Sequence, residues 1–118
     1  MTTQEKLEKI VRILDQKKAE DIQVLGITNL TILADYFVIA TGNSSTQVKA
    51  LADEVEFQLG EAGVEPRGTE GFRGANWVIL DYDDIIVHVF YREAREEYQL
   101  ERLWADGEQI DISDWLID

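Results

Sequence analysis

The stretch from Trp77 to Tyr91 constrains the fold more than any other part of the chain. Two runs rich in β-branched and aromatic residues, 77–80 and 85–91, flank the polar residues 81–84, and this pattern predicts a β-hairpin. Alternate residues of the second run point to opposite faces, with Ile85, Val87, Val89 and Tyr91 on one face and Ile86, His88 and Phe90 on the other. Neither face is plainly polar. Strands of this kind are normally covered on both faces, so we expect an α/β sheet with helices on both sides.

Length and composition favour one globular domain. A chain of 118 residues buries about two-thirds of its unfolded surface, which is enough for a single core. No apolar run approaches the roughly 20 residues that span a bilayer, and the first residues lack the apolar core of a signal peptide. The absence of cysteine excludes disulfides, thiolate nucleophiles and cysteine-based zinc sites. We therefore expect a soluble protein of the cytoplasm.

The charge of the chain restricts its partners. There are 24 acidic against 11 basic residues, a net charge of −13. Proteins that bind nucleic acid neutralise phosphates with clustered Lys and Arg, so naked RNA or DNA would be repelled over most of this surface. A basic protein is a better partner, although many acidic proteins use their charge only to stay in solution. From Glu93 onward there are nine acids and two bases, so the charge is concentrated at the C-terminal end.

Two amphipathic helices are predicted in the first half of the chain. Thr2 and Glu5 have the spacing of a capping box, and the apolar residues that follow at helical intervals predict a helix from about Thr3 to Ala19. Ser44 and Gln47 repeat this spacing before a second apolar stripe. Each stripe provides one face that must pack against another element.

Strands and short helices account for the rest. The residues 22–27 and 36–40 read as strands, and the segment 66–74, which contains the only proline, has room for one short edge strand before the hairpin. One or two short helices are expected after Tyr91, ending at Gly107. We predict a single α/β domain over residues 1–107, followed by an acidic C-terminal tail over residues 108–118.

The segment from Thr41 to Ser45 leads from a predicted strand into a predicted helix, where free N–H groups can bind an anion such as phosphate. It lacks the lysine and the glycine spacing of a P-loop, and it does not match the dinucleotide-binding glycine pattern. We favour the simpler interpretation that Ser44 or Ser45 caps the second helix.

The acids of the hairpin turn and the single histidine are the other candidates for chemistry. Asp81, Asp83 and Asp84 could hold a hard cation such as magnesium, but aspartates are common in turns for conformational reasons. His88 could be a base or a metal ligand, but it lies in a predicted strand with no cysteine to pair with. We therefore predict no catalytic residue, no metal site and no cofactor.

Aromatic residues are numerous for so small a domain: Trp77, Tyr82, Tyr98, Trp104 and Trp115. Each of them taken alone indicates packing. Together with the acidic surface they favour a protein interface over a catalytic pocket.

Taken in order, these motifs resemble the ribosomal silencing factor family, also called Iojap-like proteins. The resemblance covers about residues 5 to 106, and it is specific because the motifs are long, ordered and correctly spaced. The matching segments are Lys18-Ala19-Glu20-Asp21-Ile22, residues 34–45 (Ala-Asp-Tyr-Phe-Val-Ile-Ala-Thr-Gly-Asn-Ser-Ser), Glu70-Gly71, residues 77–82 (Trp-Val-Ile-Leu-Asp-Tyr), Val87-His88-Val89-Phe90, and Arg95 through Trp104.

The resemblance implies a mixed sheet flanked by helices with a nucleotidyltransferase-like core and no enzymatic role. It also implies a translational repressor that docks on the large-subunit ribosomal protein numbered fourteen and sterically blocks joining of the small subunit when nutrients are scarce. Family members resemble one another in forming homodimers off the ribosome. On this basis we expect seven residues to form or support the interface: Trp77, Asp81, Tyr82, His88, Tyr98, Leu100 and Trp104.

The chain departs from the family pattern in three places. Asp83 stands where the hairpin usually has glycine, which predicts a different turn, and Glu97 replaces a usual aromatic residue before Tyr98. The tail from Gln109 extends beyond the pattern and could pack on the domain, cover the docking face or order only on binding.

Two other functions remain open from the sequence. One is a nucleotidyltransferase-like enzyme that uses the loop 42–45 for phosphate and Asp81 and Asp83 for magnesium. The other is an adaptor for ribosome assembly factors.

Overall fold

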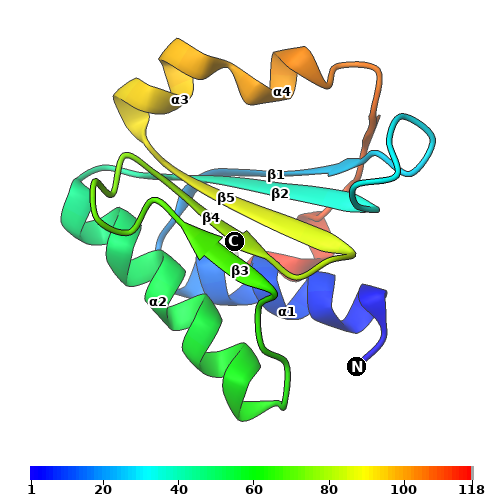
Figure 1. Cartoon of the computed structure of the whole chain (residues 1–118), viewed down its shortest axis with the longest axis horizontal. Coiled ribbons are helices and arrows are strands. Elements are labelled where there is room, and N and C mark those ends of the chain that lie inside the picture. The colour runs from blue at the N-terminus through cyan, green and yellow to red at the C-terminus, as the bar shows by residue number, and fades with distance from the viewer. Residues whose placement is uncertain (118) are drawn as a thin grey trace.

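Helices cover both faces of a mixed six-stranded sheet, as the two-sided hairpin predicted (Figure 1). The computed structural model describes residues 1–117. Among these residues the strand order is β3-β4-β5-β2-β1-β6, and only the central pair β2 and β5 is parallel. The strands are β1 (Glu20–Gly26), β2 (Tyr36–Gly42), β3 (Gly68–Glu70), β4 (Trp77–Asp81), β5 (Ile85–Tyr91) and β6 (Glu108–Gln109). The predicted mixed sheet flanked by helices is therefore confirmed.

Two long helices, α1 (Thr3–Gln16) and α2 (Ser45–Glu61), cover the face that we call the lower face. Both begin where their caps predicted, because Thr2 forms a complete capping box with Glu5 and the Ser44 hydroxyl accepts the amide N–H of Gln47. The first helix ends three residues earlier than expected from the apolar spacing. Lys18 adopts a left-handed conformation there (φ 66°), which turns the chain into β1.

Two shorter helices, α3 (Arg92–Tyr98) and α4 (Leu100–Leu103), cover the opposite or upper face (Figure 1). They are separated by Gln99, whose left-handed backbone (φ 48°) ends one helix and redirects the chain into the next. This arrangement confirms the expectation of one or two short helices after the hairpin.

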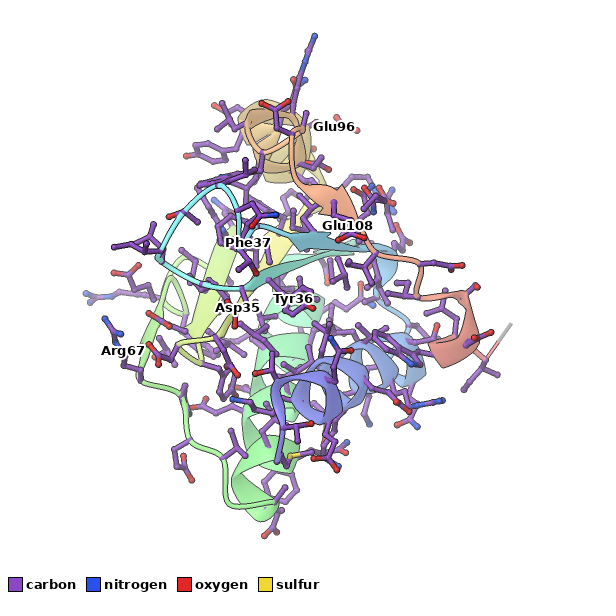
Figure 2. All side chains as sticks on the ribbon, turned by 90° about the vertical axis from the view of Figure 1, so that its right-hand side faces the viewer. Asp35, Tyr36, Phe37, Arg67, Glu96 and Glu108 are labelled. Atoms are coloured by element: carbon purple, nitrogen blue, oxygen red, sulfur yellow. The ribbon has the colours of Figure 1, made fainter. Side chains whose placement is uncertain are left out.

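The alternation along the strands separates two cores. Figure 2 shows Phe37 on the side of the sheet that faces α3 and α4, while Tyr36 lies on the side of α1, where its hydroxyl accepts a hydrogen bond from Gln4. The lower core includes Ile85, Val87 and Val89, and the upper core includes Phe90. The two faces of the second hairpin strand therefore serve separate helix layers, as predicted.

The tip of the hairpin turn is occupied by Asp83, the residue at which this chain departs from the family pattern. Asp83 has a φ of 77°, a conformation that favours glycine. Its backbone N–H donates to the Asp81 carboxylate at 2.8 Å, and its own carboxylate pairs with Arg67 at 2.9 Å. These two contacts hold an aspartate in a backbone conformation that would otherwise be strained.

The C-terminal segment packs on the domain, which is one of the three arrangements that the sequence left open. β6 adds an edge strand to β1, and the amide N–H of Ile110 donates to the carbonyl of Val24. The chain then crosses to the lower face, where Ile112 is buried and a short 3-10 helix, η1 (Ser113–Trp115), lies against α1. The last tail residue, Asp118, lies outside the described residues. Within residues 1–117 no helix has the length and apolar character to cross a membrane.

Candidate docking surface

Aromatic side chains from both sheet strands and helices meet on the upper face. We call this group the aromatic cluster; its members are Phe37, Trp77, His88, Phe90, Tyr98 and Trp104. The Trp77 ring lies between Phe90 and Tyr98, with centroid separations of 4.8 and 4.9 Å. Contacts at these separations are favourable beyond the area that they bury. The cluster therefore fixes the positions of side chains that reach the surface.

The polar contact within the cluster joins Trp77 and His88. The indole Nε1–H donates to Nδ1 of His88 over 3.1 Å, which places the imidazole proton on Nε2. His88 is only 5% exposed, and burial lowers the pKa of its imidazole from 6.5 to about 3. The ring is therefore neutral at physiological pH, and its buried Nε2 has no hydrogen-bond partner among the described residues.

Part of the cluster is open to solvent. Tyr98 is 52% exposed, and Trp77 and Trp104 are half-buried. Leu103 on α4 is also exposed, as are three apolar side chains of the loop that leads into β2: Leu30, Ile32 and Leu33. The loop and α4 both anchor in the upper core, through Ala34 and Leu100. The upper side of the molecule thus presents apolar and aromatic groups that no described residue covers, which is typical of a protein-binding surface.

The structure brings together most of the residues predicted for the interface. Trp77, His88, Tyr98 and Trp104 belong to the aromatic cluster, and Leu100 is buried beneath α4 in the upper core. Tyr98 reaches the surface, and Leu100 and His88 are buried beneath it.

Asp81 and Tyr82 lie outside the cluster. Asp81 ends β4 on the upper face, at the opposite end of the strand from Trp77. Tyr82 points to the lower core, is 4% exposed, and burial raises the pKa of its hydroxyl. Tyr82 therefore stabilises the fold from within and has no position on the upper surface.

Arg95 holds α4 in place beside this surface, although the sequence indicated no role for it beyond a place in the family motif. Its guanidinium is buried and holds three elements together: Nη1 donates to the Thr41 hydroxyl on β2 at 2.7 Å and to the Asp21 carbonyl on β1, while Nε donates to Glu101 on α4 at 2.9 Å. Because Glu101 lies in the same short helix as Leu103, this contact fixes α4 on the sheet. The sequence feature that could have identified Arg95 is its place next to Ala94, because Ala94 marks the side of the predicted helix that packs on the sheet.

The loop proposed for phosphate binding is closed by its own side chains. The position of a Cβ atom on Gly42 would lie 2.8 Å from a methyl group of Val48, so the glycine allows α2 to pack closely on the strand. The amide N–H of Asn43 donates to the Gln47 side chain at 2.7 Å, and that of Gln47 donates to Ser44. The helix N-terminus is thus capped internally, as the simpler interpretation predicted.

The acids of the hairpin turn do not converge. Asp81 accepts the Asp83 N–H, and Asp83 pairs with Arg67. Asp84 pairs with Lys6 at 2.7 Å and accepts the Thr3 hydroxyl at 2.6 Å; hydrogen bonds to Lys6 and Thr3 hold its pKa below the ordinary value despite partial burial. Within residues 1–117 no three His, Asp or Glu side chains gather at metal-binding distance. The arrangement gives no support to the nucleotidyltransferase-like reading.

Comparison with known proteins gives a consistent result. A family model described as "Ribosomal silencing factor during starvation" matches residues 1–117. The chain is similar to the protein named "Ribosomal silencing factor RsfS" of Halalkalibacterium halodurans, with 39% identity over 112 residues that cover 95% of this chain and 96% of the relative. It is also similar to the Bacillus subtilis protein of the same name, with 44% identity over 98 residues that cover 83% of each chain.

A solved structure supports the fold. The crystal structure of protein CV0518 from Chromobacterium violaceum superimposes with a TM-score of 0.87, at 39% sequence identity, over 94% of this chain and 92% of that one.

Proposed function

Since the chain belongs to the ribosomal silencing factor family, we propose that it represses translation by binding the large ribosomal subunit and sterically blocking the small subunit from joining. The family resemblance inferred from the motifs is confirmed by these comparisons. The names of the relatives describe silencing of ribosomes, which is a regulatory role rather than a catalytic one.

The exposed part of the aromatic cluster is the observation that supports docking. In the free protein, other rings of the cluster already pack against the side chains of Tyr98, Trp77 and Trp104. These side chains therefore lose little conformational freedom when a partner binds. Aromatic anchors of this kind contribute most of the binding energy in many interfaces. The net charge of −13 favours a basic partner surface and speeds the encounter with it.

The partner in this proposal is the large-subunit ribosomal protein numbered fourteen, approached in the cytoplasm at the face that the small subunit would contact. The described residues measure 33 × 33 × 31 Å, so a docked copy would keep the small subunit away by a distance of that order. No bond is made or broken in such a mechanism. In this proposal, two copies of the chain form a homodimer off the ribosome.

Rejoining of purified subunits tests the proposal. Increasing amounts of protein are added to separated subunits, and the joined fraction is measured on a density gradient. We expect the wild-type protein to reduce the joined fraction and to comigrate with the large subunit. If rejoining is unchanged at saturating protein, the proposal is wrong.

A matched pair of variants tests the surface. Tyr98→Ala removes a 52% exposed aromatic residue of the upper face, while Phe57→Ala removes a 62% exposed aromatic residue of α2 on the opposite side. Tyr98→Ala should weaken binding about tenfold, the cost of a moderate interface hot spot, whereas Phe57→Ala should have no effect. Equal effects of the two variants would argue against docking through the upper face.

A further inference from the structure

A crevice of about 560 Å³ opens at the carboxyl ends of the two parallel strands, β2 and β5. At this edge of the sheet the chain turns to opposite faces, because β2 leads into α2 on the lower face and β5 leads into α3 on the upper face (Figure 1). In open α/β sheets, ligands commonly occupy the crevice that such a change of direction leaves between neighbouring parallel strands. The position of this crevice therefore suits a binding site.

The lining of the crevice is polar throughout. It consists of three arginines, four acidic residues, Thr41 and Gln99. Because charges of both signs lie around the space, an ion of either sign would be placed near like charges as well as opposite ones. The lining therefore favours a neutral polar ligand over a free anion or cation.

Arg95 is the buried arginine of this lining, with 6% of its side chain exposed. Its Nη1 donates to the Thr41 hydroxyl and the Asp21 carbonyl on the sheet, and its Nε donates to Glu101 on α4. The remaining nitrogen, Nη2, lies 3.3 Å from the carboxylate of Asp21, which is 64% exposed and lines the crevice. Nη2 is therefore directed to the side of the guanidinium on which Asp21 reaches solvent.

The ion pair of Arg95 and Glu101 has two hydrogen bonds unmade. Nη2 of Arg95 and Oε1 of Glu101 are both buried, and neither has a hydrogen-bond partner among the described residues. Buried polar atoms normally have a partner. The two atoms belong to the same ion pair, in which Nε donates to Oε2, so they lie close together. We call them the open fork, because the pair lacks one acceptor and one donor at neighbouring positions.

Exposed side chains of the same lining can give access to the open fork. Gln99 and Arg102 line the crevice and are exposed, and the Arg102 guanidinium donates to the Gln99 side chain at 3.0 Å. Exposed side chains change rotamer within nanoseconds, so these two can move aside without the loss of a buried contact.

We propose that this crevice binds a primary carboxamide, whose carbonyl oxygen accepts from Nη2 of Arg95 and whose amino group donates to Oε1 of Glu101. A carboxamide carries its acceptor and its donors on one carbon, which matches the neighbouring positions of the open fork. It is neutral, so it places no carboxylate beside Asp21 and no ammonium group beside Arg95. Each of the two hydrogen bonds has one charged partner and is stronger for that reason. The inference is independent of the proposed function, since it uses no residue of the aromatic cluster.

A pair of small probes tests this chemistry. Butyramide is titrated into the ¹⁵N-labelled full chain, and 2-pentanone, which has the same shape and the same carbonyl but no N–H donor, is the matched control. Two hydrogen bonds to charged groups predict a dissociation constant of about 5 mM for butyramide. We expect saturable shifts at the amides of Thr41 and Glu101 and at the Nε–H of Arg95. Binding of 2-pentanone should be weaker by about tenfold or more, because Oε1 stays without a donor.

Two variants that remove the same charge test the role of Glu101. Glu101→Gln keeps the size of the side chain but can present an amino group where the open fork needs an acceptor. Glu96→Gln changes an exposed residue of the same lining that is outside the fork. The preference for butyramide over 2-pentanone should disappear in Glu101→Gln and persist in Glu96→Gln. A purely structural role of Glu101 would weaken both probes alike and leave their ratio unchanged.

A third probe distinguishes two sources of the group. N-acetyl-glutamine methylamide carries the same carboxamide on a stretch of peptide backbone. Binding as tight as that of butyramide, or tighter, would indicate the glutamine side chain of a protein partner. Weaker binding would indicate a free small amide, because the crevice then excludes the flanking backbone.

Three outcomes would overturn the inference. In the first, butyramide gives no saturable shifts around the crevice, which would mean that water serves the open fork. In the second, the wild-type protein binds butyramide and 2-pentanone equally, so that the donor has no part in recognition. In the third, inorganic phosphate binds at the crevice and butyramide does not, which would make it an anion site. All three measurements use the wild-type chain, so they decide the question even if Glu101→Gln fails to fold.

Discussion

Trp77 on β4 donates its indole N–H to Nδ1 of His88 on β5, over 3.1 Å. The register pairs Trp77 with Phe90 and Ile79 with His88, so this hydrogen bond runs diagonally between the strands. It sets the imidazole tautomer and the orientation of the half-buried indole together. One buried polar contact therefore holds in place a side chain that we assign to the docking surface.

The burial of His88 predicts a loss of stability in mild acid. The pKa of its imidazole is about 3 in the folded protein and about 6.5 in the unfolded chain, so between these values the unfolded chain binds more protons. The stabilising contribution is complete above pH 6.5 and is lost as pH falls toward 3. Between pH 6.5 and pH 5 the loss should be about 2 kcal/mol, measured as the free energy of unfolding in urea.

The comparison variant is His88→Phe, which fills the same space without a titrating group. Carboxylates contribute to acid unfolding in both proteins, so only the difference between them reports on His88. Between pH 7 and pH 5 the free energy of unfolding of the wild-type protein should fall by about 2 kcal/mol more than that of the variant. Parallel pH profiles for the two proteins would contradict the buried neutral imidazole.

Arg95 should be among the residues most sensitive to substitution. Arg95→Met keeps an apolar stem but leaves the Asp21 carbonyl and the Glu101 carboxylate without their buried donor. Removing one member of a buried ion pair costs about 3–5 kcal/mol, and the partial exposure of Glu101 places our expectation at about 3 kcal/mol. Chemical unfolding measures this cost.

Arg102→Met is the matched control for Arg95, because Arg102 is an exposed arginine that follows Glu101 on α4. This substitution should change the free energy of unfolding by no more than about 0.5 kcal/mol, as at most surface positions. The double variant Arg95→Met/Glu101→Gln should be more stable than the sum of the single effects predicts, because no uncompensated carboxylate remains. Equal costs for the two arginines would show that the buried contacts do not stabilise the helix layer.

The C-terminal tail should stabilise the domain. A chain that ends at Gly107 loses the pairing of β6 with β1, the hydrogen bond from Ile110 to Val24 and the buried side chain of Ile112. Burial of one such side chain contributes about 1.5–3 kcal/mol, so thermal unfolding of the shortened chain should begin several degrees lower. A chain that ends at Leu116 keeps these contacts and serves as the control. Identical melting temperatures would mean that the tail is a separate appendage.

The secondary structure followed closely from local patterns. Thr2 and Ser44 marked the starts of both long helices, because a capping side chain acts on amide groups only two or three residues away. The alternation in residues 85–91 gave both faces of β5 correctly, because side chains in a strand alternate whatever lies above or below. The end of α1 was less predictable, because the left-handed Lys18 gives no periodic signal.

The surface was less predictable than the elements. Tyr82 and Tyr98 look alike in the sequence, but one is 4% exposed in the lower core and the other is 52% exposed on the upper face. The interface role of the seven predicted residues remains a prediction, although the structure gathers Trp77, Tyr98 and Trp104 on one side. Arg95 was missed because its partners lie up to 74 residues away in the chain.

The sequence by itself determined an α/β domain with helices on both faces of a sheet, and its family, because periodicity, capping and ordered motifs are properties of neighbouring residues. The tertiary structure decided which aromatic residues share a surface, which acids stay unpaired and which arginine is buried. Those outcomes depend on the parallel pairing of β2 with β5 and on the return of α3 and α4 over the sheet. Contacts of that kind join residues far apart in the chain, and their energies depend on burial that no local pattern encodes.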